Sequence, residues 1–251
     1  MIQVEGVSKV FVDSNKNKRV ILSDIDLTIK RNEFFSIVGP SGCGKTVLLN
    51  ILAGFTSPTT GKVVINGKEV KKASSRYVSI FQDYKLLPWR TVRKNIELGL
   101  EVKKLPQADI DRIVNSQIES VGLSGFEDFM PREISGGMKQ RVAIARALAM
   151  EPEILFMDEP FGALDSITKE AMQLKLKNLL NQAHIETTVV FVTHDVDEAV
   201  FLADRIMVMD TSPGKISSII DVNFTNPVRK YSRTFNVVRD QIVSALAKVS
   251  K

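Results

Sequence analysis

Short apolar runs, each followed by a polar or glycine-rich break, form the most informative pattern along this chain. Four of them, residues 34–38, 77–81, 154–157 and 188–193, end directly before candidate chemistry. Their length and continuous apolar character predict buried strands of a mostly parallel sheet. Helical patterns lie between several runs, as parallel crossover connections require. Because ligands of open α/β sheets bind at the carboxyl ends of strands, we expect the four breaks to converge on one edge.

The first break carries a phosphate-binding pattern, G-x-x-x-x-G-K-[ST]. It reads Gly39-Pro40-Ser41-Gly42-Cys43-Gly44-Lys45-Thr46. Glycines let backbone N–H groups turn inward, and the helix predicted for residues 45–53 directs its positive end at the phosphates. We expect Lys45 to reach the β- and γ-phosphates and Thr46 to ligate Mg²⁺. A chance glycine turn is the alternative, and the strand before and helix pattern after the motif argue against it.

Acidic residues and a histidine follow two of the other runs. Asp158 stands where a P-loop enzyme holds its metal, and Glu159 stands where a carboxylate can activate the attacking water. Alone, this pair could be a solvated loop, but beside a phosphate loop it indicates catalysis. His194 is one of two histidines and follows the fourth run. A lone histidine is more often structural or exposed than catalytic, but this position at a strand end favours a catalytic role. Asp195 and Glu198 predict a capping box for the helix at residues 196–203.

The segment Ile134-Ser135-Gly136-Gly137-Met138-Lys139-Gln140-Arg141 resembles the signature loop of ABC-type ATPases, usually written L-S-G-G-Q. With the phosphate loop, Gln82, Asp158-Glu159, residues 163–165 and His194, it gives the ordered motif set of that family. The resemblance implies an α/β fold, with a P-loop NTPase (RecA-like) core, a mixed, mostly parallel sheet and an inserted α-helical subdomain. It places the nucleotide-binding core at residues 1–82 and 152–225, the helical subdomain at 83–151 and a short C-terminal tail and helix at 226–251.

The same resemblance implies ATP and Mg²⁺ as ligands and assigns residue roles. Glu159, His194 and Gln82 are the implied catalytic residues, and Thr46, Gln82 and Asp158 the implied metal ligands. Implied nucleotide contacts are Phe11, Gly39, Pro40, Ser41, Gly42, Cys43, Gly44, Lys45, Thr46, Val47, Ser135, Gly136, Gly137 and Asp165. Phe11 resembles the aromatic that stacks on adenine, and a core residue at a strand end is the alternative. Asp165 resembles an interface aspartate and could equally cap the helix at residues 166–180.

Two residues depart from the family pattern. Met138 stands where the signature often has Gln, a variant found in importer subunits, so no loss of activity is inferred. Val47 replaces a hydroxyl residue that would contact the α-phosphate, which removes one hydrogen bond worth about 1 kcal/mol.

The signature loop also predicts an assembly. A glycine-rich turn before a helix is a second anion site, which one chain cannot easily place on the γ-phosphate already held by its own phosphate loop. The resemblance implies a homodimer in the ATP-bound state, in which each signature loop closes over the ATP of the partner.

Composition limits the classes of protein to which the chain can belong. With 251 residues, 44% hydrophobic, the chain can build a substantial core, but no stretch approaches the ~18 apolar residues that cross a bilayer. The start lacks a signal peptide, and the single Cys43 fits a reducing compartment. The net charge of +5 could indicate nucleic acid, an anionic membrane or an anionic substrate, and a modest lysine excess on the surface is the interpretation we favour.

A single phosphate loop, no sustained heptads and no membrane helices argue against repair-type, translation-type and exporter relatives. Residues 82–89, with the pattern Q-D-x-x-L-L-P-W, and the turn at 209–216 are similar to nitrate, sulfonate and taurine importers. This likeness implies a peripheral protein on the cytoplasmic face of the cell membrane. Its implied partners are two permease subunits and, through them, an extracytoplasmic solute-binding protein, without nucleic acid. The transported solute is not encoded in these motifs.

Two other functions compete with import. One is a non-transport ABC ATPase that acts in regulation or on nucleic acid, favoured only by the basic charge. The other is a degenerate partner that holds ATP without hydrolysis, which Lys45, Asp158, Glu159 and His194 argue against.

Residues 84–89 are unusually apolar and aromatic for a loop. Leu86, Leu87 and Trp89 either pack inside the helical subdomain or, as the resemblance implies, lie at a hinge beside a groove for a cytoplasmic helix of the permease.

Overall fold

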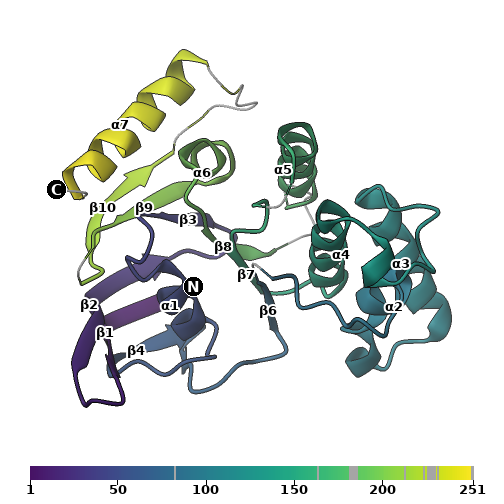
Figure 1. The fold of residues 1–251 in the computed structure, drawn as a ribbon, viewed down its shortest axis with the longest axis horizontal. Helices are drawn as coiled ribbons and strands as arrows, with labels where there is room; N and C mark the ends of the chain where they lie inside the picture. The colour runs from purple at the N-terminus through teal and green to yellow at the C-terminus, as the bar shows by residue number, and fades with distance from the viewer. Residues whose placement is uncertain are drawn as a thin grey trace. The chain divides into compact units, whose positions relative to one another are not determined.

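The computed structural model describes residues 1–81, 83–162, 164–180, 186–211, 213–222, 224, 230 and 232–249 (Figure 1). The chain divides into two compact units. The first unit contains residues 1–77 and 188–251, and the second contains residues 78–187.

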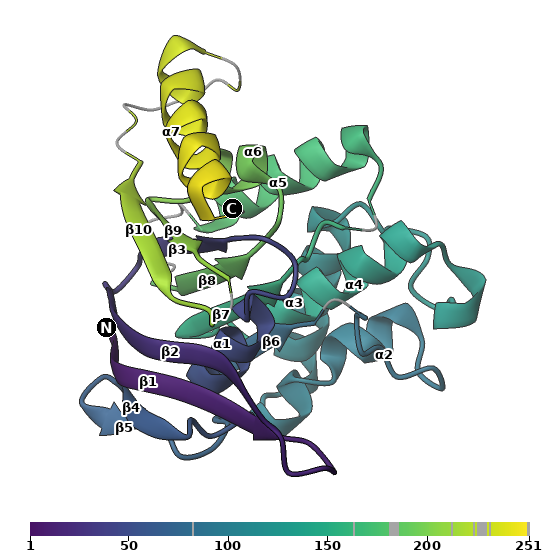
Figure 2. The same ribbon diagram turned by 60° about the vertical axis from the view of Figure 1, so that its left-hand side comes forward.

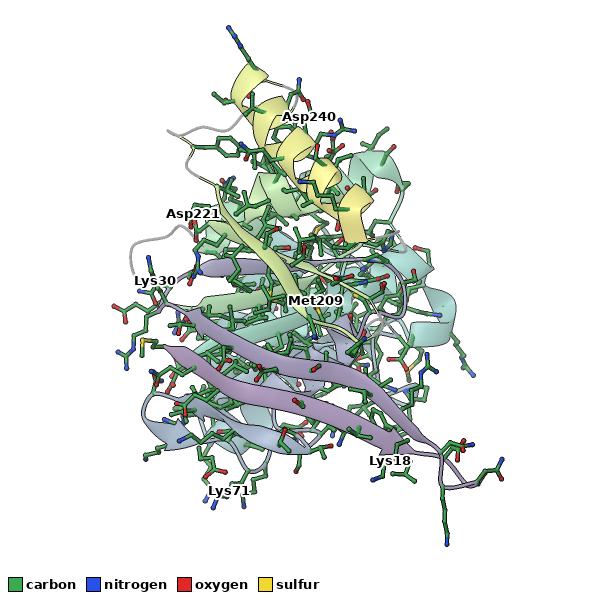
Figure 3. All side chains as sticks on the ribbon, turned by 90° about the vertical axis from the view of Figure 1, so that its left-hand side faces the viewer. Lys18, Lys30, Lys71, Met209, Asp221 and Asp240 are labelled. Atoms are coloured by element: carbon green, nitrogen blue, oxygen red, sulfur yellow. The ribbon has the colours of Figure 1, made fainter. Side chains whose placement is uncertain are left out.

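One sheet of the first unit is antiparallel. β1 (Ile2–Val12) lies between β2 (Lys18–Ile29) and β4 (Thr60–Ile65), and β5 (Lys68–Glu69) extends the sheet beside β4 (Figure 2). Ile25, Leu27 and Ile29 are buried while the residues between them are exposed, the alternation of a strand with one face on the core. Figure 3 labels Lys18, the first residue of β2, and Lys30, which directly follows its last residue.

The other sheet of this unit contains the strands that lead to the phosphate loop and His194. β3 (Phe34–Val38) runs parallel to β8 (Thr188–Val192) on one side and to β9 (Arg205–Met209) on the other. β10 (Ile216–Asp221) pairs antiparallel with β9. Every residue of β3 and β8 is buried, which explains their continuous apolar sequence. The predicted α/β fold with a mixed, mostly parallel sheet is confirmed.

Among the residues that the structure describes in the first unit, three helices occur. α1 (Lys45–Leu52) begins inside the phosphate-loop motif, and α6 (Val196–Leu202) follows His194. α7 (Arg233–Val249) packs beside α6, with Phe235 and Ile242 fully buried (Figures 1 and 2). Arg239 of α7 reaches Asp197 of α6, with Nε 2.8 Å from Oδ1.

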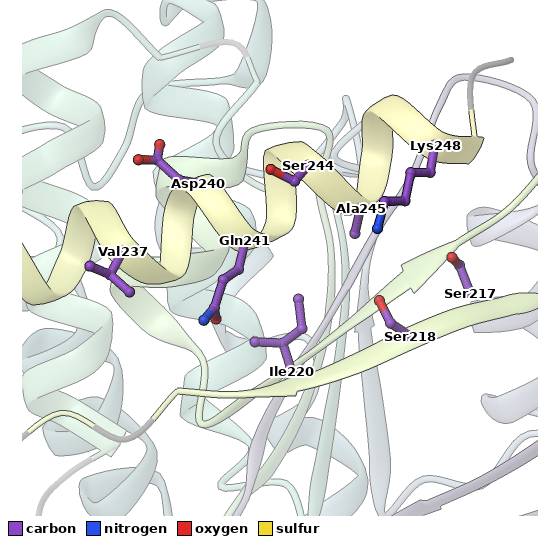
Figure 4. A pocket seen from close by; sticks show the side chains of 9 residues that line it. All are labelled: Ser217, Ser218, Ile220, Val237, Asp240, Gln241, Ser244, Ala245 and Lys248. Atoms are coloured by element: carbon purple, nitrogen blue, oxygen red, sulfur yellow. The ribbon is translucent and has the colours of Figure 1, made fainter.

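A groove of about 730 Å³ lies between α7 and β10. Figure 4 shows Gln241 of α7 facing Ile220 of β10 across it, with Ser218 and Ser244 further along. None of its lining residues belongs to the predicted nucleotide site.

The described residues of the second unit form two strands and most of the helices between the sequence motifs. β6 (Tyr77–Ile80), whose first residue belongs to the first unit, and β7 (Ile154–Asp158) are neighbouring strands. α2 (Val92–Glu97), α3 (Gln107–Ser120) and α4 (Gly136–Ala149) pack against one another, with short 3₁₀ turns η1 (Leu100–Lys103) and η2 (Pro131–Glu133) between them. α5 (Ser166–Leu180) follows β7. The subdomain boundaries at residues 83 and 151 stay a prediction.

The described part of the chain includes no helix whose length and apolar character would suffice to cross a membrane.

Candidate nucleotide-binding site

The phosphate loop connects β3 to α1 through two glycines with left-handed backbone. Gly42 has φ 79° and Gly44, the N-cap of α1, has φ 101°. Residues with a side chain rarely adopt such angles, so the loop depends on glycine at both positions. Gly44 has no side chain with which to cap α1, and the first turn of the helix contains no acidic residue. Its first N–H groups are therefore oriented as an anion site, and the loop fits a phosphate group.

A second turn packs directly against this loop. A Cβ placed on Gly214 would lie 2.1 Å from the carbonyl oxygen of Cys43, and one on Gly39 would lie 3.0 Å from the carbonyl oxygen of Met209. Met209, labelled in Figure 3, ends β9, and Gly214 lies in the turn before β10. The turn between β9 and β10, which in sequence resembles that of importer ATPases, therefore supports the phosphate loop through Met209 and Gly214 and needs glycine at position 214.

Lys45 lies folded against its own loop. Its Nζ donates hydrogen bonds to Gly39 O at 2.8 Å and Pro40 O at 3.0 Å, and the residue is only 7% exposed. An ammonium group has three donor hydrogens, so two of them serve the loop backbone. Binding of β- and γ-phosphates requires Lys45 to share or exchange these bonds.

The thiol of Cys43 is enclosed within the loop. The residue is 1% exposed, and its Sγ lies 4.0 Å from Lys45 Nζ. Burial raises the pKa of the Cys43 thiol, and the positive charge of Lys45 offsets part of this rise. The thiol is therefore enclosed and mostly protonated near neutral pH.

His194 and the phosphate loop emerge from the same edge of the sheet. Ile37 of β3 pairs with Val192 of β8, and Thr193 N–H donates to Ile37 O at 3.2 Å. Both strands run in the same direction, so the residues that follow them, Gly39 onward and His194, lie at one sheet edge. The predicted convergence is confirmed for these two motifs. His194 itself is exposed.

Two further nucleotide candidates of the first unit present side chains to solvent. Phe11 of β1 is 46% exposed, with the Lys9 ammonium 4.9 Å from its ring centroid. An interior position for Phe11 is thus wrong, and its ring is accessible for stacking. Thr46 is exposed and Val47 is half-buried on the first turn of α1.

The acidic pair of the second unit ends β7. Asp158 is 7% exposed, which suits a carboxylate that holds a cation. Glu159 adopts φ 46°, a left-handed conformation uncommon for a residue with a side chain. Strained backbone of this kind concentrates at functional sites. β6, the strand that leads toward Gln82, lies beside β7, but Gln82 falls outside the described residues.

The signature loop presents its small residues at the start of α4. Ser135 is the N-cap, and its Oγ accepts a hydrogen bond from Met138 N at 3.2 Å. Ser135 and Gly136 are exposed, and a Cβ on Gly137 would lie 3.2 Å from a methyl group of Leu164. The structure thus brings the signature loop close to the residue before Asp165.

Asp165 has the capping role that its sequence position allows. Its Oδ1 accepts a hydrogen bond from Thr168 N at 3.0 Å. Hydrogen bonding from the Thr168 side chain, and then from Thr168 N–H, lowers the pKa of the Asp165 carboxyl. The carboxylate remains exposed.

Comparison with known proteins identifies the family. The family model described as ABC transporter matches residues 22–162, more than half of the chain. The chain belongs to the ABC transporter family. This ABC ATPase binds ATP with Mg²⁺ and hydrolyses it.

Three relatives illustrate the range of similarity. An aliphatic sulfonates import ATP-binding protein, SsuB of Bacillus cereus, is 42% identical over 96% of this chain and 94% of its own length. A bicarbonate transport ATP-binding protein, CmpC of Synechococcus elongatus, is 45% identical over 91% of this chain, which spans 35% of that protein. An uncharacterized ABC transporter ATP-binding protein of Methanocaldococcus jannaschii is 45% identical over 98% of this chain and 94% of its own length.

A solved ATP-binding cassette shares the fold. It was determined as a dimer in a post-hydrolysis state with ADP and Pi bound, and it is 32% identical. The match has a TM-score of 0.80 and covers 90% of this ABC ATPase and all of that chain.

The hydrogen bonds that hold residues 84–91 of the ABC ATPase have no counterpart among the sequence predictions. Asn95, fully buried on α2, donates through Nδ2 to the carbonyl oxygens of Leu87, Arg90 and Thr91, and its Oδ1 accepts from Leu87 N at 2.8 Å. An asparagine on a short helix gives no sequence signal for such a role.

The same segment is tied to the signature helix. Arg146 of α4 donates to Tyr84 O at 2.8 Å and to Lys85 O at 2.9 Å, and both of these residues have left-handed backbone. Trp89 is 71% exposed, so an interior position for its ring is wrong, whereas Leu86 and Leu87 are half-buried.

The capping box predicted for α6 has a different arrangement. Asp195 caps the helix by accepting from Asp197 N at 2.9 Å and Glu198 N at 3.2 Å. The Glu198 carboxylate, however, accepts a hydrogen bond from the Thr193 hydroxyl and not from Asp195 N–H. Asp195 N–H donates instead to the oxygen of that same hydroxyl. The Thr193 hydroxyl thus bridges the Asp195 N–H and the Glu198 carboxylate, which would bond directly in the predicted capping box.

Proposed function

We propose that this chain is the ATP-hydrolysing subunit that powers import of a small solute, of the sulfonate, nitrate or taurine type, through a separate membrane permease. The observation that carries the proposal is the likeness, over 96% of the chain, to a protein named for import of aliphatic sulfonates. The bicarbonate transport relative supports a small anionic solute as the class. The two matched sequence segments, residues 82–89 and 209–216, agree with this choice.

The first unit binds the nucleotide. Phe11 stacks on adenine, and Gly39, Pro40, Ser41, Gly42, Cys43, Gly44 and Val47 surround the phosphates chiefly with backbone. Lys45 moves from the carbonyl oxygens of its own loop to the β- and γ-phosphates, and Thr46 ligates Mg²⁺. His194 contacts the γ-phosphate from the end of β8.

The second unit supplies the hydrolytic groups. Asp158 and Gln82 hold Mg²⁺, which when bound neutralises charge that develops on the phosphates. Glu159 accepts a proton from the attacking water, and Gln82 orients that water. Ser135, Gly136 and Gly137 form the second anion site, and Asp165 lies at the dimer contact.

Two copies of the chain close around two nucleotides in the ATP-bound state. The dimeric, product-bound relative supports this arrangement, because it is a cassette of the same fold. A solved relative described as part of a transporter complex, 25% identical with a TM-score of 0.76, supports attachment to membrane subunits. We place the protein at the cytoplasmic face of the membrane, bound to two permease subunits and, through them, to a solute-binding protein.

Substitution of the proposed base tests the chemistry. Glu159→Gln keeps the size and hydrogen bonding of the side chain but removes the base, so steady-state hydrolysis falls about 100-fold or more while ATP binding persists. The variant accumulates as an ATP-bound dimer on size-exclusion chromatography. Glu153→Gln, an exposed carboxylate before β7, is the matched control and retains hydrolysis.

Uptake measurements test the transport function separately. Cells that carry Glu159→Gln lose uptake of labelled alkanesulfonates or bicarbonate, whereas Glu153→Gln cells keep it. Undiminished hydrolysis in Glu159→Gln would refute the assigned base. Lost hydrolysis with normal uptake of every small anion tested would refute import of such a solute.

A further inference from the structure

Two buried polar residues flank the exposed His194. Thr193 precedes it, directly after β8, and is 1% exposed, and Glu198 lies in the first turn of α6 and is 4% exposed. Thr193 Oγ1 donates a hydrogen bond to Glu198 Oε2 at 2.5 Å. A carboxylate away from water is costly unless it receives hydrogen bonds, so this bond is strongly maintained.

The same hydroxyl also fixes the backbone after His194. Asp195 N–H donates to Thr193 Oγ1 at 3.0 Å. A threonine hydroxyl has one hydrogen, and because that hydrogen points at Glu198, the oxygen lone pairs are left to accept from Asp195. Glu198 therefore sets the orientation of the hydroxyl that holds the residue on the far side of His194.

The backbone before His194 is anchored as well. Thr193 N–H donates to Ile37 O at 3.2 Å, on the strand that leads into the phosphate loop. The His194 segment is thus attached to β3 on one side and, through one hydroxyl, to α6 on the other.

Helix α6 is a firm support for this attachment. Asp195 caps its first turn, and Asp197 of the same turn accepts from Arg239 Nε of α7 at 2.8 Å. The hydrogen bond from Thr193 to Glu198 therefore anchors the His194 segment to α6, which is itself packed against α7.

We propose that Thr193 and Glu198 are positioning residues for His194 in ATP hydrolysis. This inference rests on the proposed contact of His194 with the γ-phosphate. The pair keeps the His194 backbone in one conformation relative to β3, so the imidazole meets the nucleotide without a prior rearrangement of residues 193–195. Loss of the hydroxyl hydrogen bond releases the segment and lowers turnover, while phosphate binding by the loop at residues 39–46 persists.

Conservative substitutions at Thr193 separate positioning from packing. Thr193→Val keeps the shape and β-branching of the side chain and removes the hydroxyl, and Thr193→Ser keeps the hydroxyl. We expect Thr193→Val to lower kcat about tenfold or more, because small misplacements of a catalytic group have effects of this size. The KM for MgATP should stay within about twofold, as expected for an interaction that acts on the reaction step and not on binding. Thr193→Ser should restore most of the rate.

A double-mutant cycle with His194→Ala gives the decisive comparison. If Thr193 acts through His194, Thr193→Val has little further effect once the imidazole is gone, since the two effects are not additive. Glu198→Leu should behave like Thr193→Val, and Glu198→Gln, which keeps an acceptor oxygen, should be milder. Melting temperature and fluorescent-nucleotide binding confirm that each variant is folded.

Three results would overturn the proposal, and they have different meanings. An equal loss from Thr193→Val in both backgrounds would show that Thr193 acts independently of His194. A parallel loss of nucleotide binding and thermal stability would show that the pair only supports packing. Full activity of His194→Ala would remove the proposed role of His194 and the positioning pair with it, and would leave the assignment of Glu159 standing.

Discussion

The phosphate loop encloses the thiol of Cys43, and this arrangement determines how the residue reacts. With a raised pKa the thiol carries less thiolate at a given pH than an exposed cysteine, and thiolate is the reactive form. We predict maleimide labelling of the folded protein at neutral pH to be about tenfold or more slower than labelling in denaturant. The folded-state rate should still increase with pH beyond about pH 8.5, the ordinary value for a free cysteine.

MgATP should slow the labelling of Cys43 further, because nucleotide holds the loop closed over the thiol. The modified protein should lose hydrolysis, since an adduct at Sγ displaces Gly39, whose Cβ position would lie only 2.8 Å away. Rapid labelling at neutral pH together with full activity would contradict this loop structure. Mass spectrometry is unambiguous here, because the chain has a single cysteine.

At the scale of residues, the role of the phosphate-loop residues could be predicted from the sequence. The exposure of a side chain and an unusual backbone conformation could not. The order of Gly42, Gly44 and Lys45 gave the loop and its chemistry because these backbone demands are local. The exposure of Phe11 depends on how β1 is placed, and the left-handed backbone of Glu159 depends on the turn that begins where β7 ends. Neither is set by neighbouring residues, so sequence left two interpretations of Phe11 open and gave no sign of the conformation of Glu159.

At the scale of elements, Asn95 is the residue on which the connection from β6 to α2 depends. Its amide satisfies three carbonyl oxygens and one N–H of residues 87–91. Asn95→Ala removes the bonds to Leu87 N and Arg90 O, whereas Leu87 O and Thr91 O still accept from the N–H groups of Arg90 and Asn95. Since each unsatisfied group costs about 1–3 kcal/mol, we predict a loss of about 3 kcal/mol. For a chain of this size the melting temperature should fall by roughly 6–12 °C.

Asn115 on α3 provides the control for Asn95. It is exposed and accepts a hydrogen bond from Arg93, so Asn115→Ala should change stability by about 0.5 kcal/mol or less. Denaturant unfolding measures both variants. A loss for Asn95→Ala no larger than that of the control would show that solvent replaces the amide and that residues 87–91 do not depend on it.

The elements that sequence predicted well are those with one dominant signal. The strand at residues 34–38 and the helix at 166–180 have the expected bounds, because a continuous apolar run or a helical period defines each of them. Of the antiparallel strands, only the end of β1 at Phe11 was anticipated, and β2 and β4 were missed, although the alternation of Ile25, Leu27 and Ile29 was a readable signal. β10 alternates half-buried and exposed residues, which is a weaker signal.

At the scale of the whole molecule, sequence predicted the family because its motifs occur in a fixed order over nearly the entire chain. The sequence did not predict which segments support the phosphate loop, since the contact of Gly214 with this loop joins positions about 170 residues apart. The same limit applies to Arg146, whose bonds to Tyr84 and Lys85 connect the signature helix to the segment after β6. Long-range contacts of this kind follow from topology, which a single sequence specifies only through the complete fold.

The exposure of Trp89 leads to a prediction about the complete transporter. A tryptophan that is 71% exposed on an ATPase subunit contributes little to the core, and such aromatics are frequent interface anchors. Trp89→Ala should leave the melting temperature of the isolated subunit within about 2 °C, and its ATPase activity within about twofold, of the unmodified protein. Solute uptake by cells that carry the variant should fall severalfold, because the contact with the permease is weakened.

Val102 supplies a matched control for Trp89, since it is 69% exposed in the same unit and lies on η1. Val102→Ala should change neither ATPase activity nor uptake, and this contrast separates a specific contact from a general effect of removing surface apolar area. Equal losses of ATPase activity and uptake in Trp89→Ala, with a lowered melting temperature, would show that the ring stabilises the subunit itself. Normal uptake would show that Trp89 is not part of the permease contact. A loss confined to uptake is the outcome expected if residues 84–89, held by Asn95 and Arg146, transmit the state of the signature helix to the membrane subunits.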